Sequence, residues 1–496
     1  MPRHPGPRVT GKWRHRGPAG GPDLRPGLLR GPREPHPLDP EPPRTPPRPQ
    51  RARWPASPYP TLARAGPIAA RPPRGPRPLT SITFYFQVHQ PYRLRNFRFF
   101  EHGETEGYFD DSLNRFVLER VAERCYLPMN RLLLDTIEET DGAFRCAFAL
   151  TGTVLEQLED WAPEALESFQ ALAATGAVEI IAETSHHSLA SLGDAEEFGS
   201  QVHAHHRRLE ALFGQSPTTF RNTELILDEG IAAAVERMGY RTLLGEGADQ
   251  LLLGRGPRRA FRPRGTKDLT LLLRDYPFSD DIAFRFSNPE WEGYPLMADT
   301  FARRIREESD QDDFLGFYMD FETFGEHQGA QTGILDFMRW LPRYLLEEPG
   351  IDFKTPAEVR EAMPERTELP IPRPFSWADE NRDLSAWLAN PMQHSAHEAL
   401  YTLLPRVREA AELGRPELLT IWRRLSTSDH VYYMSTAHQS DGDVHEYFSP
   451  YDSPHDSFIV FMNVLDDLTR RVDEAIGASP TQRHETDARS DQETHP

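Results

Sequence analysis

One stretch of this sequence decides the fold: Gly316-Phe-Tyr-Met-Asp-Phe-Glu-Thr-Phe-Gly-Glu-His-Gln328. It begins as a strand too apolar for an exposed surface and ends in acidic side chains, a histidine and an amide. Burying carboxylates at the end of an apolar strand is costly unless they are used. In barrel-type α/β proteins the carboxyl ends of the strands are where the chemistry is assembled. The stretch therefore predicts a catalytic site, with Asp320 and Glu322 as its first candidates.

Short apolar runs followed by polar residues recur earlier in the chain. Strands are predicted at 81–89, 144–150, 178–182, 219–220, 241–244 and 314–321, and helices at 112–139, 153–176, 195–213, 229–238 and 334–346. Strands that alternate with helices are typical of parallel βα units. Several of these strands end in polar residues, which a barrel would gather on one face. The sequence therefore predicts a barrel-type α/β fold, with region 251–299 unassigned.

Composition divides the chain into four predicted segments. Residues 1–80 hold 16 Arg and Lys against 4 Asp and Glu, and 23 of the 46 prolines, so they cannot bury enough apolar surface to fold. They are predicted to be a disordered extension, and they lack the apolar run of a signal peptide. Residues 81–355 are the predicted catalytic barrel. Residues 356–477 are predicted to be a helical C-terminal domain that completes the site, and 478–496 a disordered tail.

Charge and cysteine content limit the expected partners. After residue 80 the chain has 40 basic and 72 acidic residues, and an acidic surface is unsuited to nucleic acid or an anionic membrane. No apolar run reaches the roughly 18 residues of a membrane-spanning helix. The two cysteines, Cys125 and Cys146, are too few for a disulfide framework. We therefore expect a cytoplasmic protein with no nucleic-acid or membrane partner.

A pair of carboxyl groups is enough to hydrolyse a glycosidic bond, and Glu224 and Asp320 both follow predicted strands. Arg221, close to Glu224, would keep that carboxylate ionised and hence nucleophilic. The apolar neighbours of Asp320 and the like charge of Glu322 would raise its pKa towards that of a general acid. Since alternate residues of a strand share a face, Tyr318, Asp320 and Glu322 are predicted to line the lumen. A structural ion pair is the alternative role for either acid.

Histidines and tryptophans supply candidate sugar contacts. His89 and the pair His186-His187 follow predicted strands, where they could bind sugar hydroxyls. Two tryptophans with neighbouring acids suit the flat face and the hydroxyls of a pyranose; these are Trp377, Asp379, Asp383 and Trp387. Core packing is the alternative role for Trp387.

Metal binding is the weaker interpretation throughout. His203 and His206 lie one helical turn apart and could chelate a metal, but a solvated helix surface is the favoured reading. Residues 440–445 lack the spacing and the closing Glu of a calcium loop. We therefore expect no metal and no cofactor.

Five stretches, in this order, resemble the sequence regions that define glycoside hydrolase family 57, in its α-amylase-like branch. They are residues 89–92, 179–189, 221–226, 319–327 and 377–388. The resemblance covers about residues 81–476, and its fourth and fifth stretches are the most specific.

This resemblance implies an incomplete (β/α)7 barrel followed by a mostly helical C-terminal domain. It also implies retention of anomeric configuration and no obligatory metal, with Glu224 as nucleophile and Asp320 as acid/base. The residues assigned to substrate binding are His89, Gln90, Glu183, His186, Arg221, Glu322, His327, Trp377, Asp379 and Asp383.

The expected function is a retaining α-glucan hydrolase that cleaves α-1,4 bonds in an α-glucan or malto-oligosaccharide. A 4-α-glucanotransferase or a branching enzyme on the same fold is the near alternative. A metal-dependent polysaccharide deacetylase is a more distant one, although the first strand ends in His-Gln-Pro and not in paired Asp residues. A glucan-binding protein without turnover is the non-enzymatic alternative.

Overall fold

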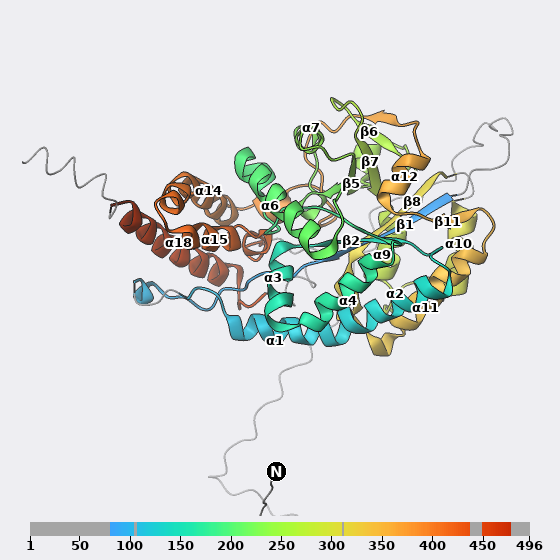
Figure 1. Cartoon of the computed structure of the whole chain (residues 1–496), viewed down its shortest axis with the longest axis horizontal. Helices are drawn as coiled ribbons and strands as arrows, with labels where there is room; N and C mark the ends of the chain where they lie inside the picture. Colours follow the sequence, from blue (N-terminus) through green and yellow to red (C-terminus); the bar gives the residue numbers. More distant parts are fainter. Residues whose placement is uncertain (1–79, 104–106, 310–311, 437–448, 478–496) are drawn as a thin grey trace, which may run out of the picture. The chain divides into compact units, whose positions relative to one another are not determined.

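The computed structural model describes residues 80–103, 107–309, 312–436 and 449–477, shown in colour in Figure 1. The predicted extension (apart from Thr80), the predicted tail and the stretch 440–445 lie outside the described residues. Within these ranges, no helix combines the length and the apolar character needed to cross a bilayer.

Seven parallel strands form a ring. They are β1 (Thr80–Val88), β2 (Cys146–Leu150), β3 (Val178–Ile180), β4 (Thr219–Arg221), β5 (Thr242–Glu246), β7 (Thr270–Arg274) and β8 (Phe314–Asp320). Two joins in the ring are short: a single bridge from Ala182 to Phe220 connects β3 to β4, and Arg274 opposite Gly316 connects β7 to β8. The ring confirms the predicted incomplete (β/α)7 barrel.

Five further short strands of the described residues lie outside this ring. They are β6 (Phe261–Pro263), β9 (Phe324–Gly325), β10 (Gln328–Gly329), β11 (Ile351–Phe353) and β12 (Thr367–Leu369). Strand β11 pairs with β1, β6 pairs with β7 and β12, and β9 pairs with β10. Region 251–299 therefore contributes one ring strand, β7, together with β6, which lies between β7 and β12.

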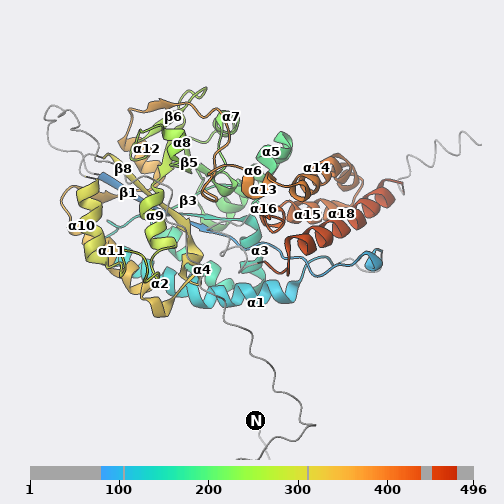
Figure 2. The same ribbon diagram turned by 180° about the vertical axis from the view of Figure 1, so that it is seen from behind.

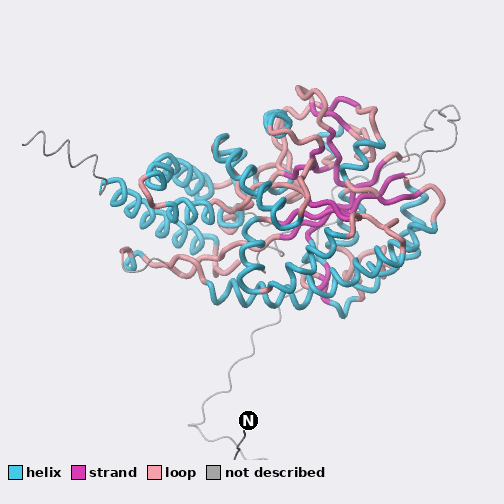
Figure 3. The backbone as a smooth tube through the Cα atoms, in the orientation of Figure 1, coloured by secondary structure: helices cyan, strands magenta, loops and turns pink. Residues whose placement is uncertain are grey.

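Helices follow the strands and pack outside the ring (Figures 1 and 3). They are α1 (Asp111–Val121), α2 (Leu127–Glu139), α3 (Gly152–Trp161), α4 (Pro163–Ala174), α5 (Ala190–Gly193), α6 (Ala195–Phe213), α7 (Glu229–Arg237), α8 (Asp249–Leu252), α9 (Tyr276–Ala283), α10 (Ala298–Glu308), α11 (Ile334–Glu347) and α12 (Pro356–Ala362). Two expected helices are interrupted. The helix at 112–139 contains a π-helical turn, η2 (Ala122–Tyr126), and the helix at 153–176 breaks at Pro163, whose ring nitrogen carries no hydrogen to donate.

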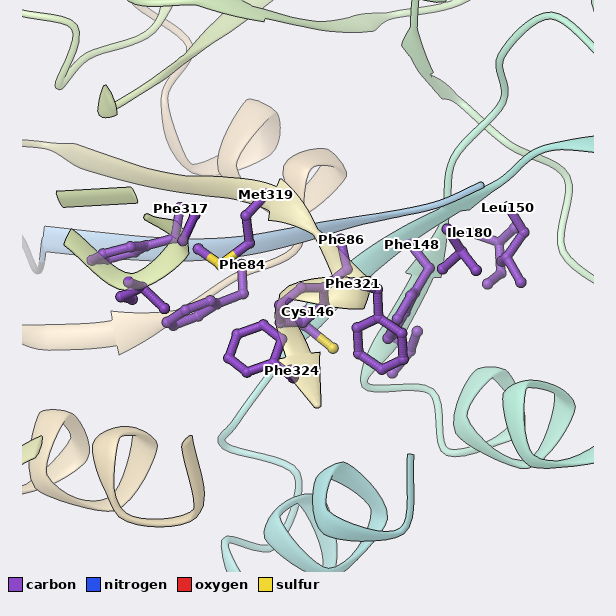
Figure 4. Close-up of a cluster of buried hydrophobic side chains, with 14 of the residues drawn as sticks. Phe84, Phe86, Cys146, Phe148, Leu150, Ile180, Phe317, Met319, Phe321 and Phe324 are labelled. Atoms are coloured by element: carbon purple, nitrogen blue, oxygen red, sulfur yellow. The ribbon is translucent and has the colours of Figure 1, made fainter. Parts of the chain in front are cut away.

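Alternation along β1 and β8 separates two cores. Phe84, Phe86, Phe317 and Met319 point outward into the cluster beneath the helices, as Figure 4 shows. Tyr85 and Tyr318 belong to a second cluster in the lumen, where their rings meet edge to face at 5.4 Å. The predicted orientation of β8 is therefore confirmed, and it delivers Asp320 to the end of the lumen.

The C-terminal helices are α13 (Ser385–Leu388), α14 (Pro391–Glu412), α15 (Pro416–Leu425), α16 (Ser428–Tyr432) and α18 (Pro454–Gly477), and Figure 2 shows them from behind. Helices α14, α15 and α18 share a core of their own, whereas the buried apolar residues of α13 and α16 lie in the barrel core. Strand β12 and helix α12 lie after residue 355 but still contact the barrel, at β6 and β5. We therefore propose that the helical domain begins near Ser385 and not at residue 356.

Candidate active site

A cavity of about 150 Å³ opens at the carboxyl ends of the strands. It is lined by nine of the twelve residues that sequence reasoning assigned to the site: His89, Gln90, Arg221, Glu224, Asp320, Glu322, His327, Trp377 and Asp379. The other three, Glu183, His186 and Asp383, are not among the described residues that line it. Residues separated by hundreds of positions in the sequence thus meet around one space.

Glu224 is held as an ionised carboxylate. It lies in the short 3₁₀ turn η3 (Thr223–Leu225) with φ 57° and ψ 27°, a left-handed conformation that costs free energy outside glycine. Its Oε1 accepts a hydrogen bond from His187 Nε2 at 3.0 Å, and its Oε2 accepts one from Trp377 Nε1 at 2.6 Å. Burial alone would raise the pKa of Glu224, but the hydrogen bond and charge of His187, the charge of Arg221 and the Trp377 bond lower it to about 2.

His187 is the residue of the His186-His187 pair that reaches the site. Its Nδ1 bonds Glu183 Oε2 at 3.0 Å while Nε2 bonds Glu224. Burial lowers the pKa of His187, but the two carboxylates outweigh it and raise the pKa to about 9. An imidazolium therefore lies between two carboxylates and donates to both.

His186, which sequence reasoning preferred, faces elsewhere. Its Nδ1 lies 2.8 Å from Ser185 Oγ, and its backbone N–H donates to Gln201 Oε1. Burial and nearby arginine charges lower the pKa of His186 to about 3, so it is neutral. The two histidines lie in an irregular loop after β3, where no strand or helix period indicates which one turns inward.

The His187 geometry predicts that His187→Gln lowers kcat about 10- to 100-fold, because a charged hydrogen bond to Glu224 is lost. The charge of His187 lowers the pKa of both Glu224 and Asp320, so its loss should move both limbs of the pH–rate profile to higher pH. Steady-state kinetics across pH would measure both effects. His186→Gln is the matched control, and an equal loss in that variant would contradict the assignment.

Asp320 has the opposite electrostatic environment. It ends β8 and lies opposite Gln87 of β1. Burial and then the negative charge of Glu224 raise the pKa of Asp320 to about 6, against the charges of Arg221, His187 and Arg274. The expected rise in pKa is thus present, but the like charge that contributes to it is that of Glu224 and not that of Glu322.

The Asp320 environment predicts an acidic pH optimum. A general acid must be protonated, so kcat/KM should fall about tenfold per pH unit above about 6, where Asp320 ionises. Glu224 stays ionised down to about pH 2, so no steep acid limb is expected above that pH. A profile of kcat/KM measured from pH 3 to 9 tests this, and a rate that stays level up to pH 8 would contradict it.

Glu322 lies beside Asp320 and is itself held in the neutral form. The residue is part of the turn η4 (Phe321–Thr323), beyond the end of β8. Burial and the charge of Asp320 raise the pKa of Glu322 to about 8. Its Oε1 accepts a hydrogen bond from Tyr126 at 2.5 Å and one from the backbone N–H of His89 at 3.4 Å.

The π-helical turn η2 anchors the loop that carries Asp320 and Glu322. Besides the Tyr126 bond, the Cys125 thiol donates to Phe321 O at 3.0 Å. Gly325 has φ 120°, and a Cβ there would lie 2.1 Å from the backbone oxygen of Arg124. Sequence reasoning missed Tyr126, because helical periodicity does not show where a π-helical turn rotates one side chain inward.

Glu326 holds the loop that follows β8 in place. Its carboxylate is fully buried and pairs with Arg120 at 2.7 Å and Arg124 at 3.7 Å. It is therefore a structural anchor of the loop, whereas its neighbour His327 does line the cavity.

Arg221 and Glu183 lie beneath the catalytic carboxylates. Arg221 is fully buried and its Nη1 lies 3.6 Å from Glu183 Oε2. Glu183 accepts from Gln87 Nε2 at 2.9 Å, and its backbone N–H donates to His205 Nδ1. His205 is buried, and its Nε2 hydrogen-bonds Leu150 O, so it joins Glu183 to the end of β2.

Trp377 orients Glu224 and also lines the cavity. The guanidinium groups of Arg221 and Arg274 lie 5.1 and 5.9 Å from its ring centroid, while its indole N–H donates to Glu224. Trp387 is 1% exposed, in the core beside Tyr432, which confirms the alternative reading for it.

Asp379 and Asp383 have different positions in the loop that follows Trp377. Asp379 lines the cavity, with φ 56°. Asp383 accepts from the backbone N–H of Ser385, the first residue of α13, at 2.8 Å, and its backbone oxygen accepts from Ser376 Oγ. Asp383 is not among the described residues that line the cavity.

Comparison with known proteins places the chain in a family. The family model described as glycosyl hydrolase family 57 matches residues 83–372. A protein of Methanocaldococcus jannaschii described as "Putative alpha-amylase" is 38% identical over 409 residues, which are 80% of this chain and 86% of that protein.

Two solved structures share the fold at low sequence identity. A GH57-type branching enzyme from Pyrococcus horikoshii has a TM-score of 0.56 and 15% identity, over 80% of this chain and 94% of that one. A 4-alpha-glucanotransferase from Thermococcus litoralis has a TM-score of 0.50 and 16% identity, over 81% of this chain and 59% of that one. The match over residues 83–372 and the 38% identity extend across most of the barrel described above, so the chain belongs to glycosyl hydrolase family 57.

Proposed function

We propose that this protein is a retaining glycoside hydrolase that cleaves α-1,4-glucosidic bonds in α-glucans. One observation carries the proposal: an ionised carboxylate, Glu224, and a carboxyl group with a raised pKa, Asp320, line the same cavity. Two carboxyl groups whose environments separate their pKa values are what a nucleophile and a general acid require.

In the first step Glu224 attacks the anomeric carbon, and the glycosidic bond breaks as Asp320 gives its proton to the departing oxygen. The two hydrogen bonds to Glu224, from His187 and Trp377, fix the direction of the attacking oxygen. The positive charges of His187 and Arg221 act on both Glu224, which is negative before the step, and Asp320, which is negative after it.

In the second step the ionised Asp320 takes a proton from water, whose oxygen attacks the anomeric carbon and releases Glu224. Two inversions at the same carbon give net retention. If the attacking hydroxyl belongs to a sugar and not to water, the same site transfers a glucan chain. Transfer is the second candidate, because the solved proteins that share the fold include a branching enzyme and a 4-alpha-glucanotransferase.

The state of the two cysteines bears on where the protein works. Cys125 and Cys146 are both buried as free thiols, which supports the expected cytoplasmic location.

The α-glucan substrate is inferred from the family and from the M. jannaschii relative.

The experiment that tests the function is incubation of the purified full chain with maltoheptaose, followed by product analysis and by NMR of the first anomer released. Shorter oligosaccharides of α configuration support retaining hydrolysis, and additional longer ones indicate transfer. An initial β anomer, or no reaction with any malto-oligosaccharide, would contradict the proposal.

A further inference from the structure

Helix α16 gives the cavity a wall that comes from the C-terminal helices. Asp429 and Tyr433 both line the cavity. The Tyr433 backbone N–H donates to Asp429 O at 2.9 Å, so the two residues lie one helical turn apart on one face. Neither residue belongs to the five stretches that resemble the family regions.

This wall is fastened to the loop that carries His187. The backbone N–H of Ser428 donates to His187 O at 2.9 Å, and Thr427 forms a bridge with Ser188. Val431, which lies between Asp429 and Tyr433, is buried in the barrel core. The position of the wall is therefore set by the same loop that positions Glu224.

Asp429 supplies a carboxylate whose orientation is fixed by His89. His89 Nε2 lies 2.9 Å from Asp429 Oδ2, and His89 Nδ1 lies 3.0 Å from Thr151 Oγ1. The His89 ring stacks on the His187 ring at 4.1 Å. Burial and then the charge of His187 lower the pKa of His89, so a neutral ring donates from Nε2 to Asp429 and accepts at Nδ1.

Tyr433 supplies a buried hydroxyl. The residue is 7% exposed, and its phenolic oxygen has no hydrogen-bond partner within the described part of the chain. A buried hydroxyl left unpaired costs free energy, so a group that enters the cavity and pairs with it would gain affinity. Asp429 and Arg93 both line the cavity, so one group of each charge is present beside this hydroxyl-bearing wall.

We propose that Asp429 and Tyr433 form a binding subsite for one neutral pyranose residue of the substrate, an assignment that rests on the proposed function. One sugar hydroxyl donates to the Asp429 carboxylate, and a hydroxyl near it accepts from the Tyr433 O–H. The helical domain thereby contributes substrate recognition as well as support.

Calorimetric binding of maltoheptaose to a Glu224→Gln background tests the subsite. Adding Tyr433→Phe, which removes one oxygen, should raise Kd about tenfold, and adding Asp429→Asn should raise it about 10- to 100-fold. Tyr401→Phe is the matched control, since the Tyr401 hydroxyl is also buried without a partner in the described residues but lies among the C-terminal helices. Thermal melting of each variant reports on folding.

A Tyr433→Phe variant that binds within about twofold of its parent would overturn the subsite while leaving the proposed function intact. If the parent binds no malto-oligosaccharide and the wild type cleaves none, both proposals fail together. A set of monodeoxy maltosides gives a second test. Removing the sugar hydroxyl that pairs with Tyr433 should raise Kd for the parent but should not raise Kd further for the Tyr433→Phe variant.

Discussion

Replacing Glu224 by Gln is expected to lower kcat/KM for maltoheptaose by about 10⁴-fold or more, because the amide cannot form the glycosyl-enzyme bond. The side-chain volume is nearly unchanged, so the fold should persist. Release of reducing ends measures the rate and circular dichroism the fold. Glu167→Gln, an exposed helical position, is the control and should keep full activity.

The backbone at Glu224 allows a more specific version of this test. Because its φ is 57°, glycine fits this position without strain and leaves space for a small anion. We expect Glu224→Gly with added azide to give a β-glucosyl azide, the product of a single inversion. If the azide product has the α configuration, or if Glu224→Gly alone retains more than a few per cent of the activity, Glu224 is not the nucleophile.

Replacing Asp320 by Asn is expected to lower kcat by about 10²- to 10⁴-fold on maltoheptaose, whose sugar leaving group needs a proton. The loss in the first step should be much smaller with an α-glucosyl fluoride, because fluoride departs without protonation. The fall in rate above about pH 6 should also disappear, since Asp320 is the group that ionises there. Steady-state kinetics with both substrates measure these differences.

Equal losses on maltoheptaose and on the fluoride would show that Asp320 acts through binding or folding and not as a proton donor. Glu322→Gln is the matched control, because Glu322 is buried beside Asp320 and its pKa is raised to about 8. Glu322 is already neutral at the pH optimum. The Glu322→Gln variant should therefore show the same ratio of rates on maltoheptaose and on the fluoride as the wild type.

The barrel and the catalytic pair could be predicted because their signals are local. Buried parallel strands read as short apolar runs, and a polar residue directly after such a run must lie at the ring's edge. Asp320, the last residue of β8, follows this rule, and Glu224 lies three residues after the end of β4. Alternation along β8 gave the correct face for Tyr318. Strand β6 of region 251–299 could not be predicted, because it is three residues long and pairs with β12, more than a hundred residues away.

Apart from Arg221, which lies three residues from Glu224, the partners of the catalytic pair could not be predicted, because they depend on contacts between distant segments. His186 and His187 are adjacent, and only the path of an irregular loop decides which of the two side chains reaches the site. Tyr126 reaches Glu322 across 196 positions through a π-helical turn, and Asp429 reaches His89 across 340. Trp377 was correctly placed at the site, but sequence alone gave no sign that its indole N–H is used by Glu224.

Trapping of the glycosyl-enzyme tests the central claim most directly. A fluorinated α-glucosyl fluoride forms the intermediate faster than water removes it, so the protein should gain the mass of one fluorosugar. Peptide mass spectrometry should find that mass on the segment around Arg221–Leu225, at Glu224. A label on Asp320 or Glu322, or rapid turnover of natural substrate with no label on any carboxylate, would contradict the account.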